Sequence, residues 1–220
     1  LSISLAATLM GCIAEDRSAC PHPRGVSVRL TVCPDPMTAV TRTTDEEALR
    51  DLNLYLYDDD GEIVLHRYQS SSTLRFTSLP GNYRMRIAAN MGRDLGENPA
   101  SEDFTVTHAD EYDTLPMSYE GDVTITSSSG GILTLPVVEV QRVVTKVSYD
   151  IAVKPADIEL RSVQLCSVPR AVSVFDVAAR PSDAPDDYTD CPESGISGQH
   201  ISAVSYTHLR AHETLSGLVC

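Results

Sequence analysis

The stretch from Val137 to Val153 constrains the fold of this chain more than any other part of the sequence. It reads VVEVQRVVTKVSYDIAV, which is rich in β-branched residues and contains neither Gly nor Pro. This composition favours a β-strand, and the run is much longer than an ordinary strand of about five or six residues. A strand of this length usually leaves one β-sandwich and enters another, so we expect a domain boundary within it.

The overall composition narrows the class of protein. The chain has 220 residues, which is room for one large or two small domains. Its net charge of -14 argues against nucleic acid as a partner. There is no Trp, and aromatic residues make up 5% of the chain, which argues against a large aromatic binding surface. No apolar run reaches about 20 residues, so no transmembrane helix is predicted.

Alternating apolar and polar residues mark the strands of the first half. Val26 to Cys33 (VSVRLTVC) has an aliphatic residue at every second position, as a half-buried strand requires. Leu52 to Tyr57 (LNLYLY) alternates in the same way, and Asp58 to Gly61 (DDDG) predicts a hairpin turn after it. The three Asp residues could instead suggest a calcium site, but a calcium-binding loop needs more ligands and a distal Glu.

Further short strands are predicted after this hairpin, and turn signals separate them. Seven or more such strands are typical of a β-sandwich built from two sheets. We therefore predict an all-β fold, with an N-terminal sandwich domain over residues 26–139 and the truncated start of a second sandwich over residues 140–203. The additional predicted strands are Glu62–Tyr68, Thr73–Thr77, Tyr83–Asn90, Asp103–Thr107, Val123–Thr126 and Ile132–Leu135.

The amino end predicts a lipid anchor. Leu1 to Met10 is apolar, and Leu-Met-Gly-Cys at its end resembles a bacterial lipobox, in which the Cys thiol accepts diacylglycerol. We expect residues 1–11 to be part of a lipoprotein signal peptide and residues 12–25 to be a tether acylated at Cys12. Glu15 and Asp16 resemble the acidic export tag of surface lipoproteins. The plainer alternatives are a cleaved secretory signal with an incidental Cys and a solvated acidic linker.

The carboxyl end resembles a translated sequencing adapter. Val204 to Thr214 (VSYTHLRAHET) matches one reading frame of a transposase-type adapter, and Leu218 to Cys220 fits the sequence that follows a short index. We expect residues 204–220 to be an artefact of this origin and exclude them from fold reasoning. On this expectation the natural gene product continues beyond about Ala203.

No catalytic or metal-binding pattern emerges from the sequence. Cys20, Cys33, Cys166 and Cys191 match no zinc spacing, and an extracytoplasmic setting permits disulfides without indicating a pairing. Cys33 and Cys166 lie in apolar strand contexts and are expected to be buried thiols. The His residues are scattered, without triad spacing. We therefore predict neither an enzyme nor a cofactor.

An ordered series of these features resembles the fimbrillins, the subunits of the protease-dependent pili of Gram-negative anaerobes. The resemblance runs from about Cys12 to Val174. Its elements are the lipobox at Cys12, the strand Val26–Cys33, the loop with Arg42, the strand Leu52–Tyr57 with its Asp-Gly hairpin, Leu79–Tyr83 (LPGNY) leading to Ala88–Gly92 (AANMG), Val140–Val147 (VQRVVTKV) and Ile158–Pro169.

The resemblance implies a fold and a mode of assembly. Fimbrillins have a transthyretin-like sandwich in each of two domains and reach the outer membrane and the cell surface as lipoproteins. An Arg-specific protease then cuts the loop after the first strand, and a strand of a neighbouring pilus subunit fills the groove that this strand leaves. On this chain the first strand is Val26–Cys33 and the cut falls between Arg42 and Thr43. Arg50 is a second candidate, although it lies against the next strand.

Two other functions stay open at this point. The start of the mature chain, Cys12 to Pro21, also resembles pilus anchor lipoproteins, which keep their lipid and need no cut at Arg42. The region that would supply a donor strand is expected to lie in the missing part of the second domain. A surface module that binds carbohydrate or protein is the other alternative, and the scarcity of aromatic residues weighs against it.

Overall fold

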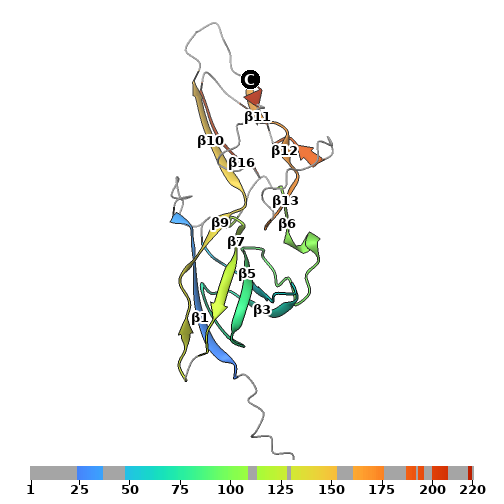
Figure 1. The fold of residues 1–220 in the computed structure, drawn as a ribbon. Helices are drawn as coiled ribbons and strands as arrows, with labels where there is room; N and C mark the ends of the chain where they lie inside the picture. The colour runs from blue at the N-terminus through green and yellow to red at the C-terminus, as the bar shows by residue number, and fades with distance from the viewer. Residues whose placement is uncertain are drawn as a thin grey trace, which may run out of the picture.

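The computed structural model confirms an all-β chain with a sandwich-type fold (Figure 1). It describes residues 24–36, 48–108, 113–127, 130–152, 161–175, 187–191, 193–195, 200–207 and 218–219. In this part of the chain no helix is long and apolar enough to cross a membrane.

The described residues form strands and one short 3₁₀ helix, η2 (Ser101–Phe104). The strands are β1 (Val26–Pro34), β2 (Leu52–Tyr57), β3 (Ile63–Gln69), β4 (Thr73–Ser78), β5 (Gly81–Ala89), β6 (Thr105–Thr107), β7 (Met117–Ile125), β8 (Leu133–Thr134), β9 (Val138–Arg142), β10 (Thr145–Ala152), β11 (Ser162–Leu165), β12 (Val168–Pro169), β13 (Ala171–Ser173), β14 (Tyr188–Thr189), β15 (Ser194–Gly195), β16 (His200–Thr207) and β17 (Leu218–Val219).

The main sheet is curled so that its two halves form the layers of the sandwich. Its strand order is β3-β2-β5-β7-β9-β1-β4, with β8 beside β1. The halves join where β7 meets β9, and this joint has only two register pairs, Met117 with Arg142 and Ser118 with Gln141. Beyond the joint β7 and β9 diverge (Figure 1). One layer therefore contains β3, β2, β5 and β7, and the other contains β4, β1, β8 and β9.

The core between the layers follows the alternation of the sequence. The aliphatic residues of β1 and the three Leu residues of β2 are buried, as are Met85, Ile87 and Ala89 of β5. The hairpin between β2 and β3 forms as predicted, with Gly61 at a φ of 83°. Alternation does not account for the other face of β2, because Asn53 and Tyr55 are also fully buried.

The Val137–Val153 stretch forms two strands, whereas the sequence suggested one. β9 ends at Arg142 in the main sheet, and β10 begins at Thr145 and pairs with β16 instead. The turn between them contains Val143 and Val144, which are both buried in the core. The burial of these two side chains explains the break, because the chain turns there to keep both in the sandwich. The change of sheet falls between Arg142 and Thr145, and the domain boundary after residue 139 stays a prediction.

β16 crosses position 204, where we expect adapter-derived sequence to begin. It lies beside β10 (Figure 1), and the antiparallel register of the two strands runs without interruption from Thr145–Thr207 to Ala152–His200. A strand ladder is held by main-chain hydrogen bonds, which many extended sequences can supply. The origin of residues 204–220 therefore stays a prediction.

Part of the region after β10 packs on the first sandwich. β13 pairs with β6, and Val172 and Val174 belong to the same buried cluster as the core of the sandwich. The rings of Phe104 and Phe175 lie edge to face with centroids 5.0 Å apart. These contacts hold the two regions together in the described part of the chain.

Candidate functional site

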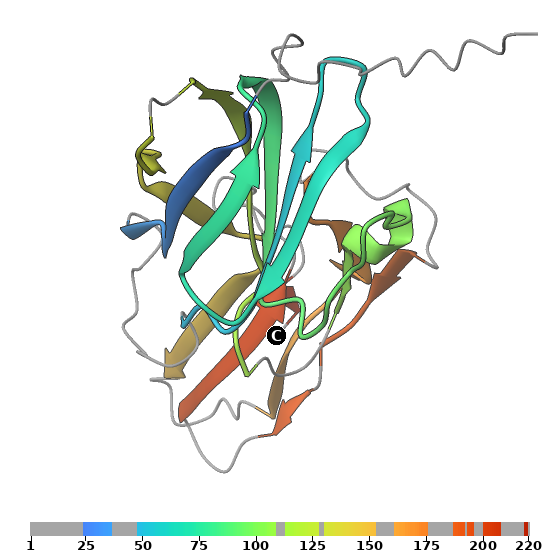
Figure 2. The same cartoon turned by 90° about the horizontal axis from the view of Figure 1, so that it is seen from below.

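The first strand, β1, lies inside the sheet and not at its edge. It pairs antiparallel with β4 from Val26–Ser78 to Thr31–Thr73 (Figure 2). On its other side it runs parallel to β8 and then to β9, with Val28 opposite Leu133 and Val32 opposite Val138. Without β1, the facing edges of β4 and of β8 with β9 would both lack a partner. We call the space between these edges, which β1 fills, the β1 slot.

The inner face of β1 contributes a row of buried side chains. Val26, Val28, Leu30 and Val32 are at most 5% exposed. Burial of one such side chain is worth about 1.5–3 kcal/mol, so the row contributes about 6–12 kcal/mol. The slot therefore cannot stand empty without a large loss of stability. An occupant that replaced β1 would need apolar side chains at the same alternate positions.

The outer face of β1 is polar and only partly covered. It presents Ser27, Arg29, Thr31 and Cys33. Burial raises the pKa of the Cys33 thiol, and the nearby carboxylates Glu139 and Asp35 raise it further. Cys33 and Cys166 are half-buried, so the expectation that both are fully buried is wrong. The alternation of β1 explains this for Cys33, because the odd-numbered positions face outward. Among the three cysteines that the structure describes, Cys191 is the buried one.

The site residues predicted from the sequence lie outside the described residues. These are the lipidation site Cys12, the export residues Glu15 and Asp16, and the processing pair Arg42 and Thr43. The structure describes the two flanks of the processing segment, from β1 to Pro36 and again from Ala48. It also describes the second candidate, Arg50, whose side chain is exposed but whose backbone N–H donates to Asn90 Oδ1 at 2.9 Å.

Asn90 fixes the chain where it re-enters the fold after the processing segment. Its Nδ2 donates to the carbonyls of Ala48 and Leu115, at 3.0 and 2.9 Å. It is 8% exposed and has a φ of 58°, a conformation that Asn tolerates better than most residues. The carboxylate of Asp51 accepts from the backbone N–H groups of Met91 and Gly92, both at 3.0 Å. The start of β2 and the end of β5 are thus tied together.

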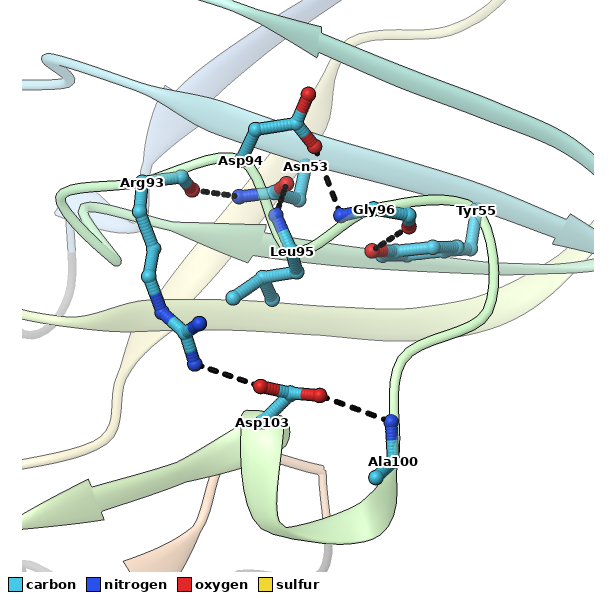
Figure 3. Close-up of polar contacts among 8 residues, drawn as sticks. All are labelled: Asn53, Tyr55, Arg93, Asp94, Leu95, Gly96, Ala100 and Asp103. Atoms are coloured by element: carbon cyan, nitrogen blue, oxygen red, sulfur yellow. Dashed lines mark hydrogen bonds and ion pairs between the residues drawn. The ribbon is translucent and has the colours of Figure 1, made fainter.

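Asn53 and Tyr55 extend these contacts along the outer face of β2 (Figure 3). We call the hydrogen bonds made by the side chains of Asn90, Asp51, Asn53 and Tyr55 the clamp. Asn53 Nδ2 donates to the carbonyl of Arg93 at 3.0 Å, and Asn53 Oδ1 accepts from the N–H of Leu95 at 2.9 Å. The Tyr55 hydroxyl donates to the carbonyl of Gly96 at 2.9 Å. Burial raises the pKa of Tyr55 well above its usual value, so this hydroxyl keeps its proton. These hydrogen bonds hold the connection that follows β5 against the outer face of β2.

The end of this connection is held by an ion pair. Arg93 Nη2 lies 2.7 Å from Asp103 Oδ1, and Asp103 Oδ2 accepts from the N–H of Ala100 at 2.9 Å (Figure 3). The hydrogen bond from Arg93 lowers the pKa of Asp103, and the bond from Ala100 lowers it further. Sequence reasoning missed this clamp. The sequence feature that could have indicated it is the polar pair Asp51 and Asn53 at the start of an apolar strand, because polar groups that become buried need hydrogen-bond partners.

A groove of about 570 Å³ opens where β7 and β9 diverge. Its walls include Tyr119 and Val123 of β7, Val137 beside β9, and carboxylates such as Asp122 and Glu139. Among the described residues no three His, Cys, Asp or Glu side chains gather to hold a metal ion. The β1 slot has a defined strand register on both sides and a row of buried side chains, so we take it as the candidate functional site.

Comparisons with known proteins show which solved structures have a similar fold. No protein-family model matches the sequence, and no curated protein sequence matches it. The structure is similar to the tip fimbrial protein Mfa3 from Porphyromonas gingivalis, solved with a C-terminal truncation. The TM-score is 0.54 at 20% identity, over 84% of this chain and 68% of that one.

Two further solved structures are similar over comparable spans. The fimbrial anchor protein Mfa2 from Porphyromonas gingivalis has a TM-score of 0.53 at 13% identity, covering 86% of this chain and 75% of that one. A candidate cell adhesion protein from Parabacteroides distasonis has a TM-score of 0.57 at 12% identity, covering 88% and 73%. These TM-scores show a common fold, which confirms the fimbrillin resemblance at that level. The chain therefore has the fold of fimbrial tip and anchor proteins.

Proposed function

We propose that this chain is a structural subunit of a cell-surface fimbria whose first strand is removed and replaced by a strand of a neighbouring subunit. The observation that carries this proposal is the placement of β1. It fills a slot between two sheet edges and buries four aliphatic side chains, and residues 37–47 separate it in sequence from the next described part of the chain. The common fold with fimbrial proteins supports the same function.

Removal of β1 would begin with a cut between Arg42 and Thr43 by an Arg-specific protease. Arg50 is the poorer site, because its N–H is bonded to Asn90 and the next residue, Asp51, is buried and bonded to Met91 and Gly92. Proteases cut most readily where the backbone is free of such bonds. After the cut, the clamp at Asn90 would keep the new amino end of the sandwich in place.

The incoming strand must satisfy the slot that β1 leaves. It needs main-chain hydrogen bonds to β4 on one side and to β8 and β9 on the other. It also needs apolar residues at four alternate positions to cover the core that Val28, Leu30 and their neighbours cover now. This is strand addition, in which main-chain bonds give affinity and alternate side chains give specificity.

Export as a lipoprotein is part of the proposal. Cys12 would carry the lipid that holds the subunit at the outer membrane before processing, and Glu15 with Asp16 would direct it to the cell surface. Stable membrane anchoring takes more than one acyl chain, and the lipidated Cys of a bacterial lipoprotein carries more than one. Replacing Cys12 with Ala should move the protein from the membrane fraction to the soluble fraction, and unchanged partition would contradict the anchor.

Digestion with an Arg-specific protease tests the processing step. The expected product begins at Thr43, as read by amino-terminal sequencing, and the fragment with β1 separates from it once a competing strand is present. An Arg42→Lys variant is the matched control and should resist the cut. A product that begins elsewhere, or equal cutting of the variant, would contradict the site.

The alternative is a pilus anchor that keeps its first strand. Its support is the start of the mature sequence, Cys12 to Pro21, together with the fold that the anchor protein Mfa2 has in common with this chain. Gel electrophoresis after protease treatment separates the two functions. Ladders of higher mass support a subunit, and a persistent monomer supports an anchor.

A further inference from the structure

Two arginines lie directly opposite each other on the outer face of the sheet around β1. Arg29 in the middle of β1 is the register partner of Arg75 in β4. Directly opposite side chains in antiparallel strands have Cβ atoms about 4.5–5.5 Å apart, and like charges at such positions are destabilising. This pair of positive charges occurs in a chain whose net charge is -14.

No carboxylate compensates this pair in the described part of the chain. The flanking register pairs are Ser27 with Thr77 and Thr31 with Thr73. On the other side of β1 the residue opposite Arg29 is Thr134 of β8. The ion pairs formed by the described residues include neither arginine. The register neighbours of the pair are therefore uncharged.

Arg29 also carries a polar atom that its surroundings do not satisfy. Its side chain is half-buried, and its Nε is buried without a hydrogen-bond acceptor. A buried donor without a partner carries a desolvation cost, and the cost is larger for a charged group. Arg75 is exposed, so its charge can point toward solvent or toward a neighbour. β1 thus fits its slot well on the inner face and poorly at one outer position.

We propose that the strand that replaces β1 carries an acidic residue at the position of Arg29, where it pairs with Arg75. This inference rests on the proposed strand exchange and names the chemistry of the partner strand. A carboxylate there would change a like-charge pair into an opposite-charge pair, and a guanidinium can donate two hydrogen bonds to it. The same change removes the buried Nε of Arg29. The slot would therefore bind the replacement more tightly than β1, which gives the exchange its direction.

Competition between two peptides tests this inference. The chain is cut within residues 37–47 at an inserted site for a specific protease, so that other arginines stay intact. One labelled peptide has the sequence of Val26–Pro34, and the second differs only by Arg29→Glu. Both carry Cys33→Ser to prevent oxidation. We expect the Glu peptide to bind about fivefold more tightly at low salt and to lose much of this advantage at high salt.

A charge reversal in the slot supplies the control. In an Arg75→Glu chain the preference should reverse, so that the Arg peptide binds more tightly than the Glu peptide. Equal binding of both peptides, or no reversal, would contradict an acidic residue at this position of the partner strand. The proposed strand exchange itself would still stand. If neither peptide displaces β1 from the cut chain, the proposed exchange itself fails, and the inference fails with it.

Discussion

Asn90 Nδ2 donates a hydrogen bond to the carbonyl of Ala48 at 3.0 Å, which joins the end of β5 to the first described residue after the 37–47 segment. The same side chain accepts from the N–H of Arg50 and donates to the carbonyl of Leu115. One residue thus fixes the point where the chain returns to the fold. These bonds would hold the start of β2 in place if the segment before it were cut.

Replacing Asn90 should weaken the fold markedly. We expect Asn90→Ala to lower the free energy of unfolding by about 2–4 kcal/mol, because three hydrogen bonds are lost at a buried site and Ala is strained at positive φ. Urea unfolding measures the change. Asn90→Gly relieves the strain and isolates the hydrogen bonds, so it should lie between Ala and the native residue. Asn82→Ala, at an exposed site with one bond to Thr124, is the control. A loss below about 0.5 kcal/mol for Asn90→Ala would contradict the clamp.

The inner face of β1 should be sensitive to truncation and its outer face should not. Leu30 is fully buried, so Leu30→Ala should cost about 2–5 kcal/mol in urea unfolding. The neighbour Thr31 faces outward, and Thr31→Ala should change stability by less than about 1 kcal/mol. Equal effects of the two substitutions would mean that β1 does not sit in the slot in this register.

The reactivity of Cys33 should report the occupancy of the slot. Its pKa lies above the ordinary value of 9.0 because the thiol is partly buried and because the carboxylates of Glu139 and Asp35 are near. The thiol therefore adds stability that is present below pH 9 and is lost as the pH rises through the folded-state pKa. Iodoacetamide should alkylate Cys33 slowly in the intact chain and faster once β1 is displaced, as measured by peptide mass spectrometry at pH 8.5. The same rate in both states would contradict the placement of Cys33 on a held strand.

The sequence predicted those elements that depend on local pattern. The alternation of Val26–Cys33 and Leu52–Tyr57 matches β1 and β2 almost residue for residue, because one face of each strand packs in the core. The parallel pairing of β1 with β8 and β9 was not predicted, since register between distant strands leaves no local signal. The burial of Asn53 and Tyr55 was not predicted either, because the connection that covers them lies about 40 residues further along the chain.

In the Val137–Val153 stretch, the pattern of residues alone does not predict where one strand ends and the next begins. Nothing in its composition marks a break, and both β9 and β10 fit it well. The break at Val143 and Val144 follows from packing, since both side chains are buried beside the joint of the two layers. The Arg29–Arg75 pair likewise becomes visible only once the register of β1 and β4 is known.

A reversible cross-link across the slot tests the removable strand most directly. Ser27 and Thr77 are register partners, so Ser27→Cys with Thr77→Cys should place a disulfide between β1 and β4. The measurement is the uptake of a labelled β1-sequence peptide by the chain cut within residues 37–47, with and without reductant. We expect no uptake in the oxidised variant, uptake after reduction, and uptake in both conditions for the cut chain without the two substitutions. Equal uptake in the oxidised and reduced variant, or none in any of these samples, would contradict a removable first strand.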